Sequence, residues 1–174
     1  RAFERLFDIV LAVLLIGTDP ANLPRKSLSA NLLAVPYAPH AALFSRAALV
    51  VHQGGVGTSA EALRSGRPML VVPHCHDQPD NAHRLERLGV ARAIPAERYT
   101  VRRATRTIAA LLADSAAAER ARILGAQIAA ETGVATACDA LIVTPPALSP
   151  ATRVHTIALL AMPTAEAVFF CIRF

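Results

Sequence analysis

The sequence predicts a doubly wound α/β domain, in which helices cover both faces of a parallel sheet. Two observations predict this fold class. Short apolar runs alternate with segments of helical periodicity from the start of the chain to residue 143, and this alternation is typical of parallel strands connected by helices. The chain of 174 residues is also 53% hydrophobic and only 18% charged, which suits one packed core and excludes intrinsic disorder.

The predicted strands are short apolar runs that end at turn residues. Runs without polar alternation are typical of strands that are buried on both faces of a sheet. The first run ends at Gly17 and the second at Pro36. The five predicted strands cover residues 9–16, 31–35, 48–51, 69–72 and 91–94.

Helices are predicted between these strands and after the last one. A short helical turn covers residues 41–46, and helices at 58–65 and 79–88 each end at a glycine. A glycine directly after a periodic segment is a common helix stop. From residue 101 the pattern is helical to about residue 142.

The domain is predicted to cover residues 1–143, and residues 144–174 are an extension of unknown role. Four of the 12 prolines fall between positions 145 and 163, and the rest of that segment has no clean period. Its apolar stretch, residues 154–172, contains Pro163 and Glu166, so we expect no integral membrane span. Residues 1–16 resemble a helix end and a strand inside a domain, so we expect the chain to begin partway through it.

The net charge of +5 comes from 17 Arg and one Lys against 13 acidic residues. The arginines are dispersed, and their densest group has helical spacing, which predicts a solvated helix face and no nucleic-acid partner. That group is Arg98, Arg102, Arg103 and Arg106. The three widely spaced cysteines form no C-x-x-C pair, which predicts a reducing, cytoplasmic location without a disulfide framework.

A loop with three glycines follows the third predicted strand. Glycines let the backbone approach a ligand closely, and the start of the following helix at Thr58 and Ser59 offers N–H groups and a positive dipole end. This arrangement suits a phosphate or diphosphate. His52, at the end of the strand, can donate to the same anion, and Glu61 can accept hydrogen bonds from ribose hydroxyls.

The same loop leaves two alternatives open. Residues 55–60 match G-x-G-x-x-A, and Asp77 follows Gly57 near the spacing of a ribose-binding acid, which is the fingerprint of an NAD-binding oxidoreductase domain. His52 and Gln53 separate the strand from the glycines, and Asp77 lies beyond the tip of the next strand, so this interpretation comes second. A capped turn without any ligand is the other alternative.

A second polar loop follows the fourth predicted strand. Asp77 and Gln78 offer a carboxylate beside an amide, a pair that suits adjacent sugar hydroxyls. Four side chains of this region could instead form a zinc site. They are His74, His76, Asp77 and His83. No second ligand shell is evident for them, so we expect no metal.

Six short motifs in order resemble the donor-binding signature of bacterial UDP-glycosyltransferase-like enzymes. They lie at residues 37–40, 52–58, 61–66, 68, 72–73 and 77–82. The resemblance is dense from residue 32 to residue 95 and looser to residue 141. It implies the carboxyl-terminal half of a GT-B fold, in which two Rossmann-like domains face each other across a cleft.

The resemblance also implies roles for particular residues. Glu61 would hold the ribose, Tyr37 and Ala38 would lie beside the base, and Asp77 with Gln78 would hold the donor sugar. The diphosphate would be held by His52, Gly55, Gly57, Thr58 and Ser59. In plant members a Trp stands where this chain has Tyr37, and one residue fewer separates the His from the Glu.

The activity implied is hexosyl transfer from a UDP- or dTDP-sugar to an acceptor hydroxyl, with inversion and without a metal or other cofactor. In this family the base that deprotonates the acceptor comes from the amino-terminal domain, so we assign no catalytic residue within this chain. The partners expected are the nucleotide-sugar, a small-molecule acceptor and that amino-terminal domain. A non-catalytic remnant that only binds nucleotide is a further alternative.

Overall fold

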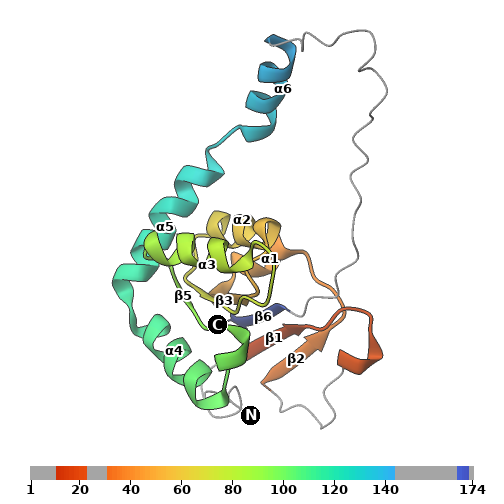
Figure 1. Ribbon diagram of the computed structural model, residues 1–174, viewed down its shortest axis with the longest axis vertical. Helices are drawn as coiled ribbons and strands as arrows, with labels where there is room; N and C mark the ends of the chain where they lie inside the picture. The colour runs from red at the N-terminus through yellow and green to blue at the C-terminus, as the bar shows by residue number, and fades with distance from the viewer. Residues whose placement is uncertain (1–10, 23–30, 144–167, 173–174) are drawn as a thin grey trace. The chain divides into compact units, whose positions relative to one another are not determined.

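The computed structural model describes residues 11–22, 31–143 and 168–172. The expected helix end before residue 11 and most of the expected extension at 144–174 lie outside these described residues. The described strands form one six-stranded sheet in the order β2-β1-β6-β3-β4-β5 (Figure 1). The strands are β1 (Leu11–Leu15), β2 (Leu32–Val35), β3 (Ala47–His52), β4 (Met69–Val71), β5 (Ala91–Ala93) and β6 (Val168–Ile172).

The predicted parallel sheet is confirmed for β1 to β5. β1 pairs in parallel with β2, and β4 pairs in parallel with both β3 and β5. β6 differs, because it lies between β1 and β3 and is antiparallel to both. Sequence analysis did not predict this strand, since it follows a proline-containing segment that lacks a clear period.

The helices lie close to their predicted ranges. They are α1 (His40–Phe44), α2 (Val56–Arg64), α3 (Gln78–Arg87), α4 (Val101–Ala113), α5 (Ser115–Ala129) and α6 (Gly133–Val143), with short 3-10 turns η2 (Pro20–Asn22) and η3 (Ala96–Arg98). The single helical span expected after residue 101 is divided. Asp114 separates α4 from α5, and its carboxylate accepts the N–H of Ala117 at 2.9 Å, which caps the new helix.

Helices cover both faces of the sheet, as a doubly wound fold requires. Alternate residues of each strand point to opposite faces. Val50 and Val71 pack on one face with Phe44 of α1 and side chains of α2, α3 and α5. Val51, one position along β3, packs on the opposite face with Ile108 of α4.

The chain divides into two compact units. One contains residues 1–129 and 165–174, and the other contains residues 130–164, in which α6 lies. The candidate site described below lies in the first unit. Within the described part of the chain, no helix has the length and apolar character needed to cross a membrane.

Candidate functional site

The carboxyl ends of β3 and β4 lie at the same edge of the sheet, which is where ligands bind in this fold class. Gly54, just after β3, has a φ of +96°. A Cβ atom at this position would lie 2.9 Å from Cγ1 of Val71 and 3.2 Å from the carbonyl oxygen of Gln78. Only glycine fits at this position, because the glycine loop packs directly against the end of β4 and the start of α3.

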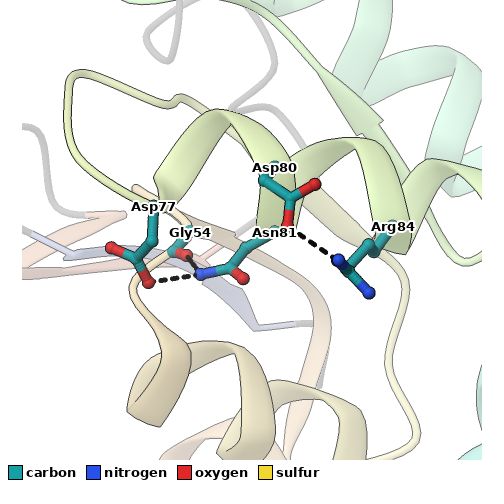
Figure 2. A network of polar contacts seen from close by, with 5 residues as sticks. All are labelled: Gly54, Asp77, Asp80, Asn81 and Arg84. Carbon is teal, nitrogen blue, oxygen red and sulfur yellow. Dashed lines mark hydrogen bonds and ion pairs between the residues drawn. The ribbon is translucent and has the colours of Figure 1, made fainter.

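Asn81 of α3 joins the two polar loops, as Figure 2 shows. Its Nδ2 donates to the carbonyl oxygen of Gly54 at 2.9 Å and to Oδ2 of Asp77 at 2.7 Å. One amide group therefore fixes the loop after β3 relative to the loop after β4. Asn81 lies inside the motif at 77–82, but sequence analysis assigned it no role.

His52 is the last residue of β3 and is only 2% exposed. Its Nδ1 accepts the N–H of Gly54 at 3.1 Å, so in the neutral ring the proton is on Nε2. Burial, and to a lesser degree the charge of His40, lower the pKa of His52 to about 4. The ring is therefore neutral at pH 7.

The Nε2 atom of His52 is buried and has no hydrogen-bond partner among the described residues. An unpaired buried donor is costly, so its presence points to a ligand or water acceptor. His52 also lines a pocket of about 210 Å³ at the carboxyl ends of β3 and β4. The lining residues are Val51, His52, Gln53, Val72, His74, Ala96 and Tyr99.

The N-terminus of α2 begins beside His52. The expected helix start at Thr58 and Ser59 is wrong, because the helix begins at Val56 and its N-cap is Gly55 in an extended conformation. The N–H of Ser59 already donates to the carbonyl oxygen of Gly55 at 2.9 Å. The N–H groups at the open end therefore belong to Val56, Gly57 and Thr58, and Ser59 does not contribute one.

The space in front of this helix end is open. A Cβ atom added at Gly57 would meet no atom within 4 Å, and the side chain of Val56 is 71% exposed. A helix N-terminus with accessible N–H groups and a positive dipole end suits an anion. The Oγ atom of Ser59 is buried and has no partner among the described residues.

Glu61 lies further along α2 and interacts with His40 of α1. The pKa of His40 is lowered by burial, and the negative charge of Glu61 partly opposes this shift. The His40 ring stacks on Phe44, with 4.8 Å between the ring centroids. Glu61 itself is half-buried.

The two residues predicted to lie beside the base differ in exposure. Tyr37 is 75% exposed in the loop after β2 and forms no hydrogen bond within the described residues. Ala38 is half-buried and packs against the main core cluster.

Asp77 and Gln78 occupy different environments, although they are adjacent. Asp77 is exposed and accepts from Asn81. Gln78 is only 4% exposed, and its Oε1 accepts the N–H groups of His74 at 2.9 Å and Cys75 at 3.2 Å. Gln78 therefore shapes the loop, whereas Asp77 presents a carboxylate to solvent.

The metal-site alternative has no structural support in the described residues. Nowhere in 11–22, 31–143 or 168–172 do three or more His, Cys, Asp or Glu side chains gather closely enough to hold a metal ion. His74, His76 and His83 are all exposed, and His76 has a φ of 57° in the left-handed region.

Comparison with known proteins identifies the family of this chain. Residues 10–142 match the model described as "Erythromycin biosynthesis protein CIII-like, C-terminal domain". The chain is 42% identical over 116 residues to O-mycaminosyltylonolide 6-deoxyallosyltransferase from Streptomyces fradiae, covering 66% of this chain and 28% of the relative. It is 36% identical over 139 residues to oleandomycin glycosyltransferase from Streptomyces antibioticus, covering 80% and 32%.

The similar solved structures are glycosyltransferases as well. The glycotransferase of kitacinnamycin superposes with a TM-score of 0.70 at 34% identity, over 77% of this chain and 35% of that one. The glycosyltransferase VinC, solved in complex with dTDP, gives a TM-score of 0.57 at 30% identity, over 60% and 26%. The chain thus spans about a third or less of each relative's length. With the family model matched over most of its residues, the chain belongs to the erythromycin biosynthesis protein CIII-like C-terminal domains of GT-B glycosyltransferases.

Proposed function

We propose that this chain binds the nucleoside diphosphate part of a UDP- or dTDP-sugar and forms the donor-binding half of an inverting hexosyltransferase. The observation that carries the proposal is the buried, unpartnered Nε2 donor of His52 at the carboxyl edge of the sheet, in a ring held neutral by burial. The N–H groups of the first turn of α2 supply further donors nearby. Together these groups suit a diphosphate.

The chemistry follows from where negative charge develops. When an acceptor hydroxyl attacks the anomeric carbon, the bond to the nucleoside diphosphate breaks and charge grows on the leaving phosphate. Fixed donors that point at this charge stabilise the transition state. Nε2 of His52 and the N–H groups of Gly57 and Thr58 would supply this stabilisation without changing protonation state.

The other predicted residues would hold the rest of the donor. Glu61 would accept hydrogen bonds from the ribose hydroxyls, and Tyr37 with Ala38 would lie beside the base. Asp77 would accept from sugar hydroxyls. Gln78, with its Oε1 already used by the loop, would act mainly by keeping Asp77 in place.

The acceptor and the base that deprotonates it would come from an amino-terminal domain. The relatives are about three to four times as long as the matched region, which supports a further domain in the complete enzyme. We therefore assign no general base to this chain. A cytoplasmic location likewise remains a prediction from the cysteine pattern.

Calorimetric titration of the folded chain with UDP, dTDP, UDP-glucose and dTDP-glucose tests the proposal. We expect at least one to bind, and we expect His52→Ala and Glu61→Ala each to weaken binding about tenfold or more, as loss of a charge-assisted or buried hydrogen bond would. His83→Ala and Glu97→Ala remove the same side-chain types from exposed positions and serve as controls.

Three outcomes would contradict the proposal in different ways. Absence of binding by all four ligands at millimolar concentration would exclude a nucleotide-sugar site. A fluorescence change of NADH on addition of the chain, without nucleotide-sugar binding, would favour the oxidoreductase alternative. Donor binding without any sugar transfer, even after the amino-terminal half of a relative is supplied, would indicate a remnant that only binds nucleotide.

A further inference from the structure

Arginines gather at η3 and at the start of α4. They line a hollow of about 680 Å³ together with two threonines. The lining residues are Arg98, Thr100, Arg102, Arg103, Arg106 and Thr107. We refer to this hollow as the arginine groove. It contains no acidic lining residue.

The guanidinium groups of the arginine groove are exposed and unpaired. Among the described residues, none of its four arginines forms an ion pair. Three described arginines elsewhere pair with carboxylates: Arg84 with Asp80 at 2.7 Å, Arg92 with Asp114 at 3.9 Å and Arg122 with Glu119 at 2.6 Å. Because no acidic residue lines the groove, its four positive charges repel one another.

The helix adds to this repulsion. Arg102 and Arg103 lie in the first turn of α4, which contains no acidic residue. Cations at the positive end of a helix dipole are destabilising. An anion bound in the groove would remove both penalties, because it would neutralise the guanidinium groups and the helix end together.

The surroundings limit the size of this anion. An adjoining hollow shares Arg98, Arg103 and Thr107 but also contains Glu86. Arg92, in that second hollow, lies 3.9 Å from the carboxylate of Asp114. The groove thus gathers four arginines in one concave region between residues 98 and 107 without an acidic lining residue, whereas nucleic acids bind along extended basic stripes.

We propose that the arginine groove binds a small multivalent phosphate anion, such as a short polyphosphate or a compound that carries several phosphate groups. Arginine forks match phosphate oxygens in geometry and charge, and Thr100 and Thr107 add hydroxyl donors. None of the six lining residues belongs to the proposed donor site. The groove is built on η3 and the start of α4, although Ala96 of η3 and the adjacent Tyr99 line the pocket that contains His52.

Residue-resolved NMR of the chain titrated with inorganic tripolyphosphate tests the proposal. We expect saturable amide shifts at residues 98–107 with one-to-one stoichiometry. The Arg102→Gln, Arg106→Gln double variant should bind at least about tenfold more weakly, since it loses two charged hydrogen-bond donors. The Arg64→Gln, Arg87→Gln double variant loses the same charge from exposed arginines outside the groove and should bind within about twofold of the parent chain.

Several results would overturn the proposal. They are shifts that never saturate, shifts confined to residues 52–58, or an equal loss of affinity in the control variant. Shifts at residues 52–58 would still leave the donor site intact, so the two proposals fail separately. Tighter binding of a single-stranded DNA oligonucleotide or of phosphatidylglycerol vesicles through Arg102 and Arg106 would show that the partner class is wrong.

Discussion

At the scale of single residues, His52 shows how burial prepares a hydrogen-bond donor. A protonated imidazole would attract a diphosphate more strongly but would be costly to bury. The neutral ring, fixed by the N–H of Gly54, keeps its one remaining proton on Nε2. The backbone of the glycine loop therefore selects the tautomer that can donate to a ligand.

The lowered pKa of His52 predicts a pH-dependent stability. In the unfolded chain this histidine binds a proton near pH 6.5, and in the folded chain near pH 4. Between these values the unfolded state binds more protons, so the free energy of unfolding falls as pH falls below about 6.5, and the loss is complete near pH 4. The shift corresponds to a loss of roughly 3 kcal/mol.

Urea unfolding at about pH 7 and about pH 4.5 measures this effect. In His52→Asn, Oδ1 can accept the N–H of Gly54 in place of Nδ1, and the variant should lose distinctly less stability on acidification than the parent. His83→Asn, at an exposed position, should behave like the parent chain. Parallel pH profiles for parent and His52→Asn would show that His52 is not the group responsible.

Asn81 carries the second prediction at the residue scale. Asn81→Ala removes both hydrogen bonds of Nδ2 and leaves the carbonyl oxygen of Gly54 without this donor, so we expect a loss of about 1–3 kcal/mol in urea unfolding and weaker nucleotide binding. Asp80→Ala, on the same helix, breaks only the exposed pair with Arg84 and should cost at most about 1 kcal/mol. Equal effects of the two variants would contradict the connecting role of Asn81.

At the scale of elements, we expect one substitution at the N-terminus of α2 to change stability and nucleotide binding in opposite directions. Gly57 lies in the first turn with open space beside it. Because alanine is the better helix former, Gly57→Ala should stabilise the chain by as much as about 1 kcal/mol. The same methyl group would enter the space in front of the helix end, so nucleotide affinity should fall.

Thermal unfolding and calorimetric titration of Gly57→Ala measure the two effects together. The expected result is an equal or higher Tm with weaker nucleotide binding. Gly133→Ala, at the start of α6, also places its Cβ in open space and should leave binding unchanged. A Gly57→Ala chain that binds as tightly as the parent would move the diphosphate away from this helix end.

Most elements could be predicted because each depends on a short local pattern. Residues 48–51 of β3 and 69–71 of β4 are apolar at every position, since one residue faces α4 and the next faces α2 and α3. The predicted start of α2 lies two residues too late. The N-cap is Gly55 in an extended conformation, and this conformation depends on backbone geometry rather than on residue type. β6 was missed because its place in the sheet depends on pairing with strands distant in sequence.

The candidate site could likewise be predicted only where it depends on local sequence. The types and order of His52, Glu61 and Asp77 can be seen in the sequence, but side-chain environments depend on tertiary contacts. Gln78 is turned inward to bind the His74 and Cys75 amides, although its neighbour Asp77 is exposed. The contact of Asn81 with Gly54, 27 residues away, likewise exists only once α3 has packed against the end of β3.

At the scale of the whole molecule, we propose that residues 1–143 suffice for donor binding. The proposed site is built on β3, β4, α2 and α3, all before residue 88. β6 comes from the segment beyond residue 143 and lies between β1 and β3. Because β1 and β3 are both antiparallel to β6, they run in the same direction and can pair in parallel when β6 is absent.

A chain truncated after residue 143 should therefore close to the parallel order β2-β1-β3-β4-β5. We expect it to unfold cooperatively in urea, with reduced stability from the lost β6 pairing, and to bind nucleotide within about threefold of the parent chain. Truncation after residue 95 also removes α4, which covers Leu49, Val51 and Leu70, and should prevent cooperative folding. If the chain ending at residue 143 failed to fold or to bind nucleotide, β6 would be part of the domain itself, and the proposed boundary at residue 143 would be wrong.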